Sequence, residues 1–426
     1  MNIRRVTLEP DGAQALADAL SPPPPDGAIA GRVAQIVADV RVHGDDALVE
    51  LTRRFDCPGF TREQIRVPRA VIARAVAELD PVLRDAILVA ATQVRELAEA
   101  TRPSDCSVGL PLGQQITVRQ FPVAAAGLYV PGGRAAYPSS LIMAAVPAQV
   151  ARVARIAVMT PPTTDGAAHA VILATAGLLG IDEVYAVGGP GAIAALAFGT
   201  QTIAPVSVIA GPGSAWVQEA KRQVFGAVGI DGIAGPSELV VVADGDADPV
   251  EIAADLLGQA EHGPDSPAIL VSPDRVLVGA VASALADGDA PGAVTLVDCD
   301  GLDSALLFAE AFAPEHLQLQ VADAERLARG VNHAGAVFVG ANGGTAFGDY
   351  VAGSNHILPT GGAARFASSV SAATFMRRMS VITLPDAAVV KMTPHLAAIA
   401  DAEGFPNHRR SAELRAARIA REGAAQ

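Results

Sequence analysis

Residues that could bind a metal ion lie in separate parts of the sequence. Gln259 and His262 stand three residues apart at the end of a helical pattern over 249–261, so their spacing places both side chains on one helix face. Asp349 and His356 lie in a later glycine-rich loop. Two further candidates near the C-terminal end are Glu403 and His408. Imidazole, carboxylate and amide groups brought together from separate elements can form a zinc site.

An adjacent acid and base occur just before a predicted strand. Glu315 and His316 follow Pro314, which restricts the backbone. Neighbouring residues on a strand face opposite sides, but at the start of a strand both side chains can reach one cleft. A glutamate and a histidine are suited to proton transfer near neutral pH. A salt-bridged surface pair remains the alternative. Surface or satisfied core positions are the expectation for the isolated histidines His43, His169, His333 and His395.

Three glycine-rich turns each follow a predicted strand. The segment 189–194 reads G-x-G-x-x-A between a strand and a helix, where small residues let backbone N–H groups approach a pyrophosphate. The usual Rossmann fingerprint also has an acidic residue about 20 positions later, and the next strand ends without one, so a tight turn without a cofactor remains open. The other turns are Gly127–Gly133 and Gly211–Ser214. Their succession indicates one site lined by loops.

The elements that position these residues follow an α/β pattern. Residues 28–100 show helical periodicity, and short apolar runs alternating with helical stretches come after them. The runs are 123–130, 155–159, 183–187, 206–209, 238–243, 268–272, 294–297, 317–321 and 336–339. Repeated β–α alternation favours parallel sheets covered by helices. The number of predicted strands is larger than we expect for a single sheet. We therefore expect two Rossmann-like parallel-sheet domains lacking an ordinary dinucleotide fingerprint, with small helical appendages at both ends.

The expected domain boundaries follow from these patterns. Residues 1–25 form an N-terminal appendage that ends in a proline-rich connector. Residues 26–128 together with 237–370 form the first α/β domain, which carries the candidate metal and acid–base residues. Residues 129–236 form the second α/β domain. Residues 371–426 form a helical C-terminal tail without a strand.

Composition excludes several classes of protein. The net charge of −14 argues against non-specific binding to nucleic acid, which requires lysine and arginine to neutralise phosphates. The three cysteines have no C-x-x-C spacing, so neither a zinc ribbon nor a disulfide framework is expected. No apolar run is long enough for a membrane span, and the first residues lack the pattern of a signal peptide. We therefore expect a cytoplasmic protein.

Eight stretches carry a more specific signal, in order from about residue 120 to 410. They are GLYVPGGRAAYPSSLIM (127–143), AVGGPGAIAALAFGT (186–200), GPGSAWVQEAKRQV (211–224), AGPSELVVVAD (234–244), QAEHGPDS (259–266), APEHLQL (313–319), GDYVAGSNHILPT (348–360) and AEGFPNH (402–408). Together they closely resemble the histidinol dehydrogenase family. The N-terminal region is similar in helical pattern only.

This resemblance implies a set of site residues. The zinc ligands of the family fall on Gln259, His262, Asp349 and His408, with one zinc ion per subunit. Its acid–base pair falls on Glu315 and His316. Its substrate contacts fall on Ser237, His316, His356 and Glu403, besides the four metal ligands. The resemblance also implies a homodimer in which the tail crosses over, so that His408 completes the zinc site of the neighbouring subunit.

The resemblance further implies NAD as the cofactor, on the side of residues 129–236. One NAD contact of the family falls on Tyr129. Two others fall on Gly191 and Ser214, where the family usually has glutamine and asparagine. The family reaction is a four-electron oxidation of L-histidinol to L-histidine through L-histidinal, the last step of histidine biosynthesis. His316 is then expected to accept the hydroxyl proton, and Glu315 to activate the water that attacks the aldehyde.

Other functions remain open at this stage. A related zinc- and NAD-dependent dehydrogenase could act on another small polyol or amino alcohol. A metallohydrolase could use Glu315 as the base for a zinc-bound water, without NAD. A binding protein without enzymatic activity is also possible if the zinc site is empty. Formation of NADH from L-histidinol, with and without a chelator, distinguishes these alternatives.

Overall fold

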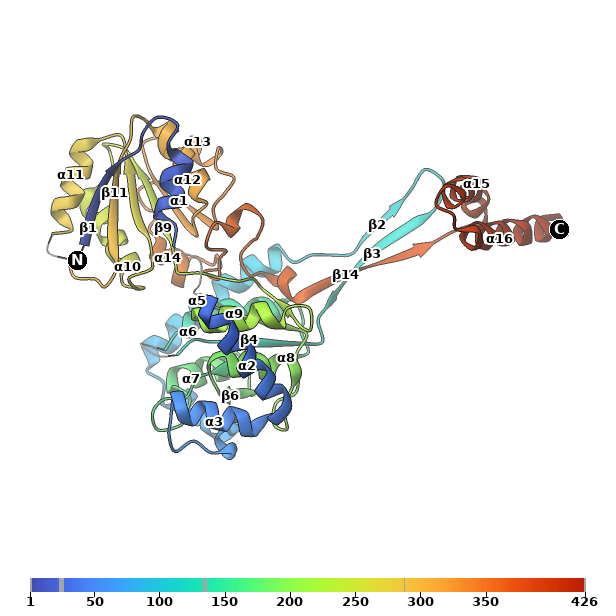
Figure 1. Cartoon of the computed structure of the whole chain (residues 1–426), viewed down its shortest axis with the longest axis horizontal. Coiled ribbons are helices and arrows are strands. Elements are labelled where there is room, and N and C mark those ends of the chain that lie inside the picture. The colour runs from blue at the N-terminus through green and yellow to red at the C-terminus, as the bar shows by residue number, and fades with distance from the viewer. Residues whose placement is uncertain (1, 23–26, 133–135, 287, 425–426) are drawn as a thin grey trace. The chain divides into compact units, whose positions relative to one another are not determined.

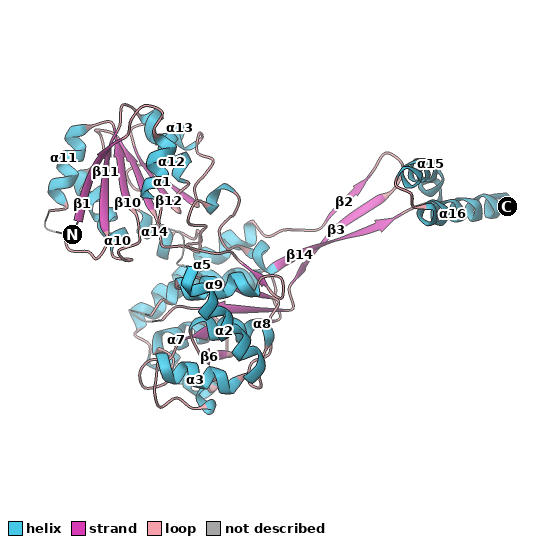
Figure 2. Cartoon of the chain, viewed as in Figure 1, coloured by secondary structure: helices cyan, strands magenta, loops and turns pink. Residues whose placement is uncertain are grey.

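The computed structural model describes residues 2–22, 27–132, 136–286 and 288–424. The chain divides into two compact units. Unit 1 contains residues 1–102 and 123–375, and unit 2 contains residues 103–122 and 376–426. Within the described part of the chain, each of the apolar runs predicted to be a strand is a strand, which confirms the α/β class. The strands form three sheets, coloured magenta in Figure 2.

The first sheet of unit 1 has six parallel strands. In spatial order they are β1 (Asn2–Thr7), β11 (Ala293–Asp298), β10 (Ala268–Ser272), β9 (Leu239–Ala243), β12 (His316–Gln320) and β13 (Ala336–Val339). Both faces of its central strands are buried, which explains their continuous apolar runs. Helices α10 (Pro249–Ala260) and α11 (Arg275–Ala284) cover one face. Helices α1 (Ala13–Leu20), α12 (Leu302–Phe312) and α13 (Ala324–Ala328) cover the other (Figure 1).

The second sheet of unit 1 has five parallel strands. Their order is β6 (Val184–Ala186), β5 (Arg155–Thr160), β4 (Ala125–Tyr129), β7 (Val208–Ala210) and β8 (Gly229–Ile230). The connecting helices are α6 (Pro138–Val150), α7 (Ala170–Leu178), α8 (Gly189–Phe198) and α9 (Ala215–Val224). After β4 the chain adds β5 and β6 on one side of this strand and then β7 and β8 on the other. The carboxyl ends of β4 and β7 therefore form a topological switch point. Open α/β sheets bind ligands at such points.

Four N-terminal helices pack against the helices of this second sheet. They are α2 (Gly27–His43), α3 (Asp45–Phe55), α4 (Arg69–Glu78) and α5 (Pro81–Ala100). Helix α2 contacts α8 and α9, α4 contacts α7, and α5 contacts α6. Local sequence sets where α5 begins, because the Asp80 carboxylate accepts the Leu83 N–H at 3.0 Å and Pro81 occupies the first helical position.

These contacts differ from the predicted domain boundaries. Residues 1–25 are not an appendage, because β1 pairs with β11 along six residues and Ala17 of α1 is buried in the core beside α12. Residues 27–100 and β4 belong with the five-stranded sheet rather than with 237–370. Helical periodicity identifies an apolar face but not the surface it covers, which explains the wrong assignment. The proline-rich connector falls largely on residues 23–26, outside the described residues.

Unit 2 combines an antiparallel sheet with a helix pair. Its strands are β14 (Met376–Thr383), β3 (Gln115–Pro122) and β2 (Cys106–Gly109), and its helices α15 (Asp386–Ala402) and α16 (Pro406–Ala424) pack together. The prediction of a tail without strands was wrong at β14. This strand is mostly exposed and mixes arginines with apolar residues, so no apolar run marks it in the sequence.

The remaining described elements of unit 1 are short. They are helix α14 (Thr345–Tyr350) and the 3₁₀ turns Arg62–Gln64, Ala363–Arg365 and Ala372–Phe375. Across the described ranges, none of the helices has the length and apolar character needed to span a membrane. Cys57, Cys106 and Cys299 are free thiols.

An ion pair fastens β1 to the six-stranded sheet and gives a test of its position. The Arg5 guanidinium binds Asp298 of β11 through Nε and Nη2, at 2.7 and 2.8 Å. We expect Asp298→Asn to lower the free energy of unfolding by about 1 kcal/mol at neutral pH, the upper range for a partly exposed pair. Urea unfolding measures this difference, and Arg4→Ala, which removes the exposed neighbouring arginine, is the matched control.

The same pair predicts a pH dependence. The Arg5 hydrogen bond lowers the pKa of Asp298, so the carboxylate contributes stability above its unfolded pKa of about 3.9. That contribution is lost as pH falls through the folded pKa. The difference between wild type and Asp298→Asn should therefore shrink in acid. A difference that stays constant down to the acid limit would contradict this role of the ion pair.

Candidate active site

One pocket of unit 1 is lined by loops from both of its sheets. It has a volume of about 540 Å³. Ser237 and Glu315 lie at the amino ends of β9 and β12, where the parallel register pairs Leu239 with His316. Residues 131–132 and 212–214, at the carboxyl ends of β4 and β7, line the same pocket. The amino edge of one sheet therefore meets the carboxyl edge of the other. Among the described residues, two of the three glycine-rich turns that we expected to line one site contribute to this pocket.

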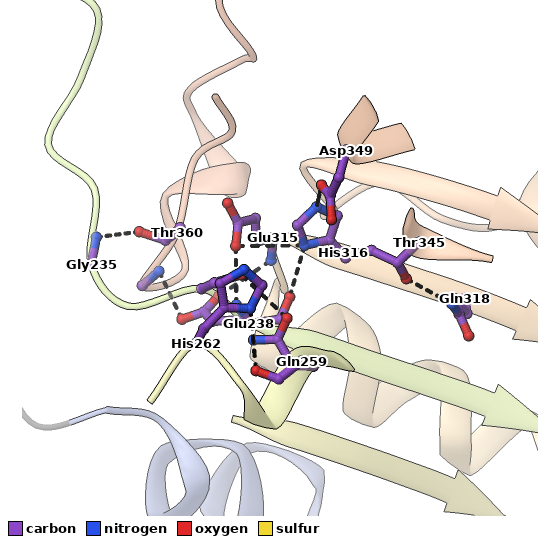
Figure 3. Close-up of polar contacts among 12 residues, drawn as sticks. Gly235, Glu238, Gln259, His262, Glu315, His316, Gln318, Thr345, Asp349 and Thr360 are labelled. Carbon is purple, nitrogen blue, oxygen red and sulfur yellow. Dashed lines mark hydrogen bonds and ion pairs between the residues drawn. The ribbon is translucent and has the colours of Figure 1, made fainter. Parts of the chain in front are cut away.

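The chain turns sharply to present the acid–base pair. Ala313 ends α12 in the left-handed conformation, with φ of 53°, and Pro314 follows. Glu315 Oε2 accepts the backbone N–H of Glu238 at 3.0 Å, and His316 Nδ1 lies 3.2 Å from the Glu238 carbonyl oxygen (Figure 3). Since a carbonyl oxygen only accepts hydrogen bonds, Nδ1 carries a proton, and Nε2 is the ring nitrogen that can exchange a proton with a substrate. Both predicted residues reach one pocket, and neither is an exposed surface ion pair.

Burial and neighbouring charges set the protonation of this pair. Burial raises the pKa of Glu315, against the opposing effect of the His316 charge. Burial opposes the charged form of His316, but its hydrogen bond to Asp349 and the charge of Glu315 raise its pKa overall. Burial also raises the pKa of Glu238 to about 7. Buried groups with pKa values displaced towards neutrality are suited to moving protons.

Asp349 and His356 join the pair from the loop around α14. Asp349 Oδ1 lies 3.3 Å from His316 Nε2, and its Oδ2 makes no hydrogen bond within the described part of the chain. His356 Nδ1 donates to the Asp349 carbonyl oxygen at 2.7 Å. His356 Nε2 then accepts a hydrogen bond from the Ser140 hydroxyl at 3.2 Å. Burial lowers the pKa of His356, against the opposing effect of the Asp349 charge, and so favours the neutral ring. Ser140 was not singled out from the sequence.

Gln259 and His262 enter the site at the end of α10. Helix α10 ends at Ala260, so His262 lies just beyond it rather than on the helix, with Nδ1 3.2 Å from the Gln259 carbonyl oxygen. The helix stops because Gly263 adopts a φ of 142°. Gln259 is buried, and Ser237 Oγ donates to its Oε1 at 3.3 Å. Its other amide atom has no partner among the described residues.

These donors fit a divalent metal ion. Exchanging the two Gln259 amide atoms, which coordinates alone do not distinguish, leaves an unpaired oxygen and gives Ser237 a donor. His262 Nε2 and Asp349 Oδ2 also make no hydrogen bonds in the described ranges. An amide, an imidazole and a carboxylate are an appropriate but incomplete zinc set. No group of three His, Cys, Asp or Glu side chains suited to a metal occurs among the described residues.

The two predicted site residues of the C-terminal tail lie in unit 2. Glu403 and His408 stand at the junction of α15 and α16 and line a groove of about 760 Å³ within that unit. Apolar side chains, including Leu396, Ile399 and Phe405, form much of its wall. Within unit 1, the structure brings Glu315, His316, His262 and Asp349 to one pocket, and Gln259 adjoins it through Ser237.

A buried amide connects three elements that carry site residues. Gln318 lies two residues after His316 on β12, and its Nε2 donates to Asp255 at 3.0 Å and to Thr345 at 2.6 Å. Asp255 is one turn before Gln259 on α10, and Thr345 is one turn before Asp349 on α14. Figure 3 shows Gln318 and Thr345 beside the site. This network fixes the spacing of the site residues.

A second pocket of unit 1 adjoins the first through Ser214, which lines both. Its volume is about 350 Å³, and its wall includes residues 188–191, Phe55 and Trp216. Predicted NAD residues Gly191 and Ser214 therefore line one pocket. Tyr129 lines neither, because it is buried with its hydroxyl accepting the Gly189 N–H at 3.1 Å, so it supports the turn. The end of the first glycine-rich turn, Gly133, lies outside the described residues.

A buried ion pair supports the turn that contains Ser214. Lys221 Nζ lies 2.5 Å from Asp231 Oδ1 and donates to the Gly211 carbonyl oxygen at 3.1 Å. Asp231 Oδ2 accepts the Gly211 N–H at 2.7 Å. Both side chains are almost completely buried. Sequence reasoning missed this pair and also Glu238. For Glu238 the available signal was a charged residue directly before the buried apolar strand β9.

The histidines expected to be structural have ordinary roles. His43 is exposed beside Asp39, His169 caps α7 by accepting the Val171 N–H, and His333 pairs with Glu310. His395 is exposed on α15 and lines the groove of unit 2.

Comparison with known proteins gives a consistent result over nearly the whole chain. A family model described as histidinol dehydrogenase matches residues 25–416. Histidinol dehydrogenase of Zymomonas mobilis is 44% identical over 400 residues, covering 91% of this chain and 92% of that protein. The Rhodospirillum rubrum protein of the same name is 46% identical over 394 residues, covering 88% and 89%. The crystal structure of histidinol dehydrogenase from Elizabethkingia anophelis matches with a TM-score of 0.91 at 30% identity, covering 97% and 98%.

The buried ion pair predicts a large stability effect. Lys221→Met leaves the Asp231 carboxylate buried without its cation, which should cost about 3–5 kcal/mol of unfolding free energy. Chemical denaturation measures it. The double variant Lys221→Met, Asp231→Asn removes the charge but retains an acceptor for Gly211, so it should recover part of the loss. Lys391→Met, at an exposed position of α15, is the control, and an equal loss in that variant would contradict this assignment.

Proposed function

The chain belongs to the histidinol dehydrogenase family, oxidoreductases of histidine biosynthesis, and we propose that it oxidises L-histidinol to L-histidine through L-histidinal, with one zinc ion per subunit and two molecules of NAD in turn. The observation that carries this proposal is the convergence of Glu315, His316, His262 and Asp349 on one pocket. These side chains are an acid–base pair beside potential metal ligands, at an edge where an α/β sheet binds ligands.

The metal-binding residues of unit 1 support the zinc proposal. Gln259, His262 and Asp349 would hold the ion together with His408 of the partner subunit. The bound ion would hold the imidazole and amine of histidinol and take no redox role. Ser237, His356 and Glu403 would contact the remaining polar groups of the substrate. The unpaired amide atom of Gln259 is the feature of this chain that such an ion would satisfy.

His316 and Glu315 divide the proton transfers between them. Bound NAD⁺ would supply the hydride acceptor for both oxidations. In the first, His316 Nε2 would accept the hydroxyl proton of the alcohol. Water would then add to the aldehyde as Glu315 takes a proton from it and His316 returns its proton to the carbonyl oxygen, which gives the hydrate and leaves His316 able to act again. In the second oxidation His316 would accept a hydroxyl proton of the hydrate. The Glu238 carbonyl holds the proton on Nδ1, so Nε2, which lies beside Asp349, would be the ring nitrogen used in both transfers.

The two adjoining pockets suggest how NAD binds. The nicotinamide must reach the catalytic pocket, and Ser214 links that pocket to the one lined by residues 188–191. The remainder of the dinucleotide would then lie along the turns before α8 and α9, whose backbone N–H groups suit a pyrophosphate. Tyr129 would act by holding the first of these turns. Gly191 and Ser214 would contact the cofactor directly.

We also propose a cytoplasmic homodimer. The apolar groove of unit 2 and the exposed side chains Val390 and Leu414 offer a surface for a second copy of the chain. Glu403 and His408 would then complete the site of the partner. The free thiols fit a reducing compartment. The acidic net charge gives no reason to expect nucleic acid as a partner.

The central test is the stoichiometry of the reaction. With zinc, NAD and L-histidinol, the purified protein should produce about two NADH for each substrate consumed, because the hydride acceptor is used twice. Absorbance of NADH and chromatography of the products measure both quantities. A chelator should abolish the reaction, and added zinc should restore it. Accumulation of the aldehyde with one NADH, or hydrolysis without NADH, would refute the proposal.

Sharing of the site between subunits can be tested by complementation. His262→Ala and His408→Ala should each be nearly inactive, since each removes a proposed zinc ligand. Mixed dimers would contain one intact site and one site lacking both ligands. Random exchange of equal amounts should therefore restore roughly a quarter of wild-type activity in a twofold-symmetric dimer.

Differently tagged chains provide the control for exchange between subunits. Zinc content gives an independent measurement, because only the intact site of a mixed dimer should retain the metal. Demonstrated exchange without any recovery of activity or zinc would place the complete site within one chain.

A further inference from the structure

The Glu238 side chain lies next to the catalytic pocket, between Ser237 and the buried strand β9, and has no place in the mechanism above. It precedes β9, and its side chain is buried at 1% exposure. Every polar group of this residue is used within the site. Its carbonyl oxygen receives both the backbone N–H of His316, at 3.1 Å, and His316 Nδ1. Its own N–H binds Glu315 Oε2.

The Glu238 carboxylate completes a reciprocal arrangement with Glu315. Glu238 Oε2 accepts the backbone N–H of Glu315 at 3.2 Å, while Glu315 Oε2 accepts the backbone N–H of Glu238 at 3.0 Å. The other oxygen, Oε1, accepts the N–H of Gly361 at 2.9 Å. One carboxylate therefore joins the segments before β9 and β12 to the loop that follows the candidate substrate-binding residue His356. Figure 3 shows the contacts of Glu238 beneath Glu315 and His316.

We propose that Glu238 is the positioning residue of the reaction: its two carboxylate oxygens hold the Glu315 and Gly361 backbones, and thereby fix the Glu315 carboxylate in the orientation that activates water. This inference rests on the proposed function for its catalytic consequence. Glu238 touches no reacting atom, so it acts through Glu315. A carboxylate is required because both partners are N–H donors, and only a carboxylate presents two acceptors. An amide satisfies one donor and turns an NH₂ group towards the other.

The decisive variant is therefore Glu238→Gln, which retains size and shape. With L-histidinal supplied directly, kcat for the aldehyde half should fall about 10–100-fold, the usual cost of losing a residue that orients a catalytic group. KM for NAD should change little, because the residue contacts neither NAD turn. Glu238→Asp should not rescue kcat, since its shorter side chain cannot reach both N–H groups. Glu219→Gln, another buried carboxylate in unit 1, should keep normal kinetics. Rescue by Asp, or unchanged kcat in Glu238→Gln, would overturn the proposal.

A double-mutant cycle separates positioning from general damage. If Glu238 acts through Glu315, adding Glu238→Gln to Glu315→Gln should lower the residual rate less than about twofold, because effects on residues that share one network are not additive. If the rate of the double variant falls by the product of the two single losses, the proposal is overturned. The same four proteins should show coupling of about tenfold in the unfolding equilibrium constant, since each carboxylate binds the backbone N–H of the other residue. Absence of this coupling would also overturn it.

A measurement on the wild-type protein needs neither folding of a variant nor activity. The N–H groups of Glu315 and Gly361 should exchange with deuterium slowly, at the rate of the adjoining β9 and β12 amides, because a buried carboxylate holds them. Fast exchange at either position would contradict the geometry. If wild type produces no NADH from histidinol, the proposed function fails. The exchange rates and the unfolding cycle still decide whether Glu238 holds Glu315.

Discussion

The parallel pairing of β9 with β12 is the constraint on which the site depends. It sets Leu239 beside His316, so the segments that precede the two strands lie against each other. Their backbone groups are then past the end of the regular ladder and require other partners. Glu238 and Glu315 provide them for each other. A shift of register by one residue would separate these groups and reverse the faces of every side chain on β12.

This arrangement buries charge at some cost, which the surrounding polar groups offset. A buried carboxylate without partners is strongly unfavourable, whereas Glu238 accepts two N–H groups and Asp349 faces His316. The same hydrogen bonds that make burial tolerable also fix orientation. Gln318 extends this support to α10 and α14. The elements that carry the residues suited to a metal and the acid–base pair are therefore joined by one hydrogen-bond network.

The pocket lies between the carboxyl edge of the five-stranded sheet and the amino edge of the six-stranded sheet, and these two walls differ in chemical character. Loops at the carboxyl ends of β4 and β7 are rich in glycine and bring backbone N–H groups close to a ligand. Segments at the amino ends of β9 and β12 instead carry acids and imidazoles. One side is therefore suited to hold a nucleotide by its backbone, and the other to move protons by its side chains. Neither sheet alone contains both capabilities.

The sequence by itself determined the α/β class and the predicted strands, because these depend on local periodicity. It also singled out Glu315 and His316 as an adjacent acid and base, and the structure places both in one pocket. It also located Gln259, His262, Asp349 and His356 as candidates. Only the tertiary structure decided that β1 completes the six-stranded sheet and that 27–100 covers the other one, since an apolar face does not specify its partner. The roles of Glu238, Lys221 and Gln318 likewise needed coordinates. Hydrogen bonds between residues more than 60 positions apart leave no periodic trace in a single sequence, and a buried charge reveals its purpose only through the groups that surround it.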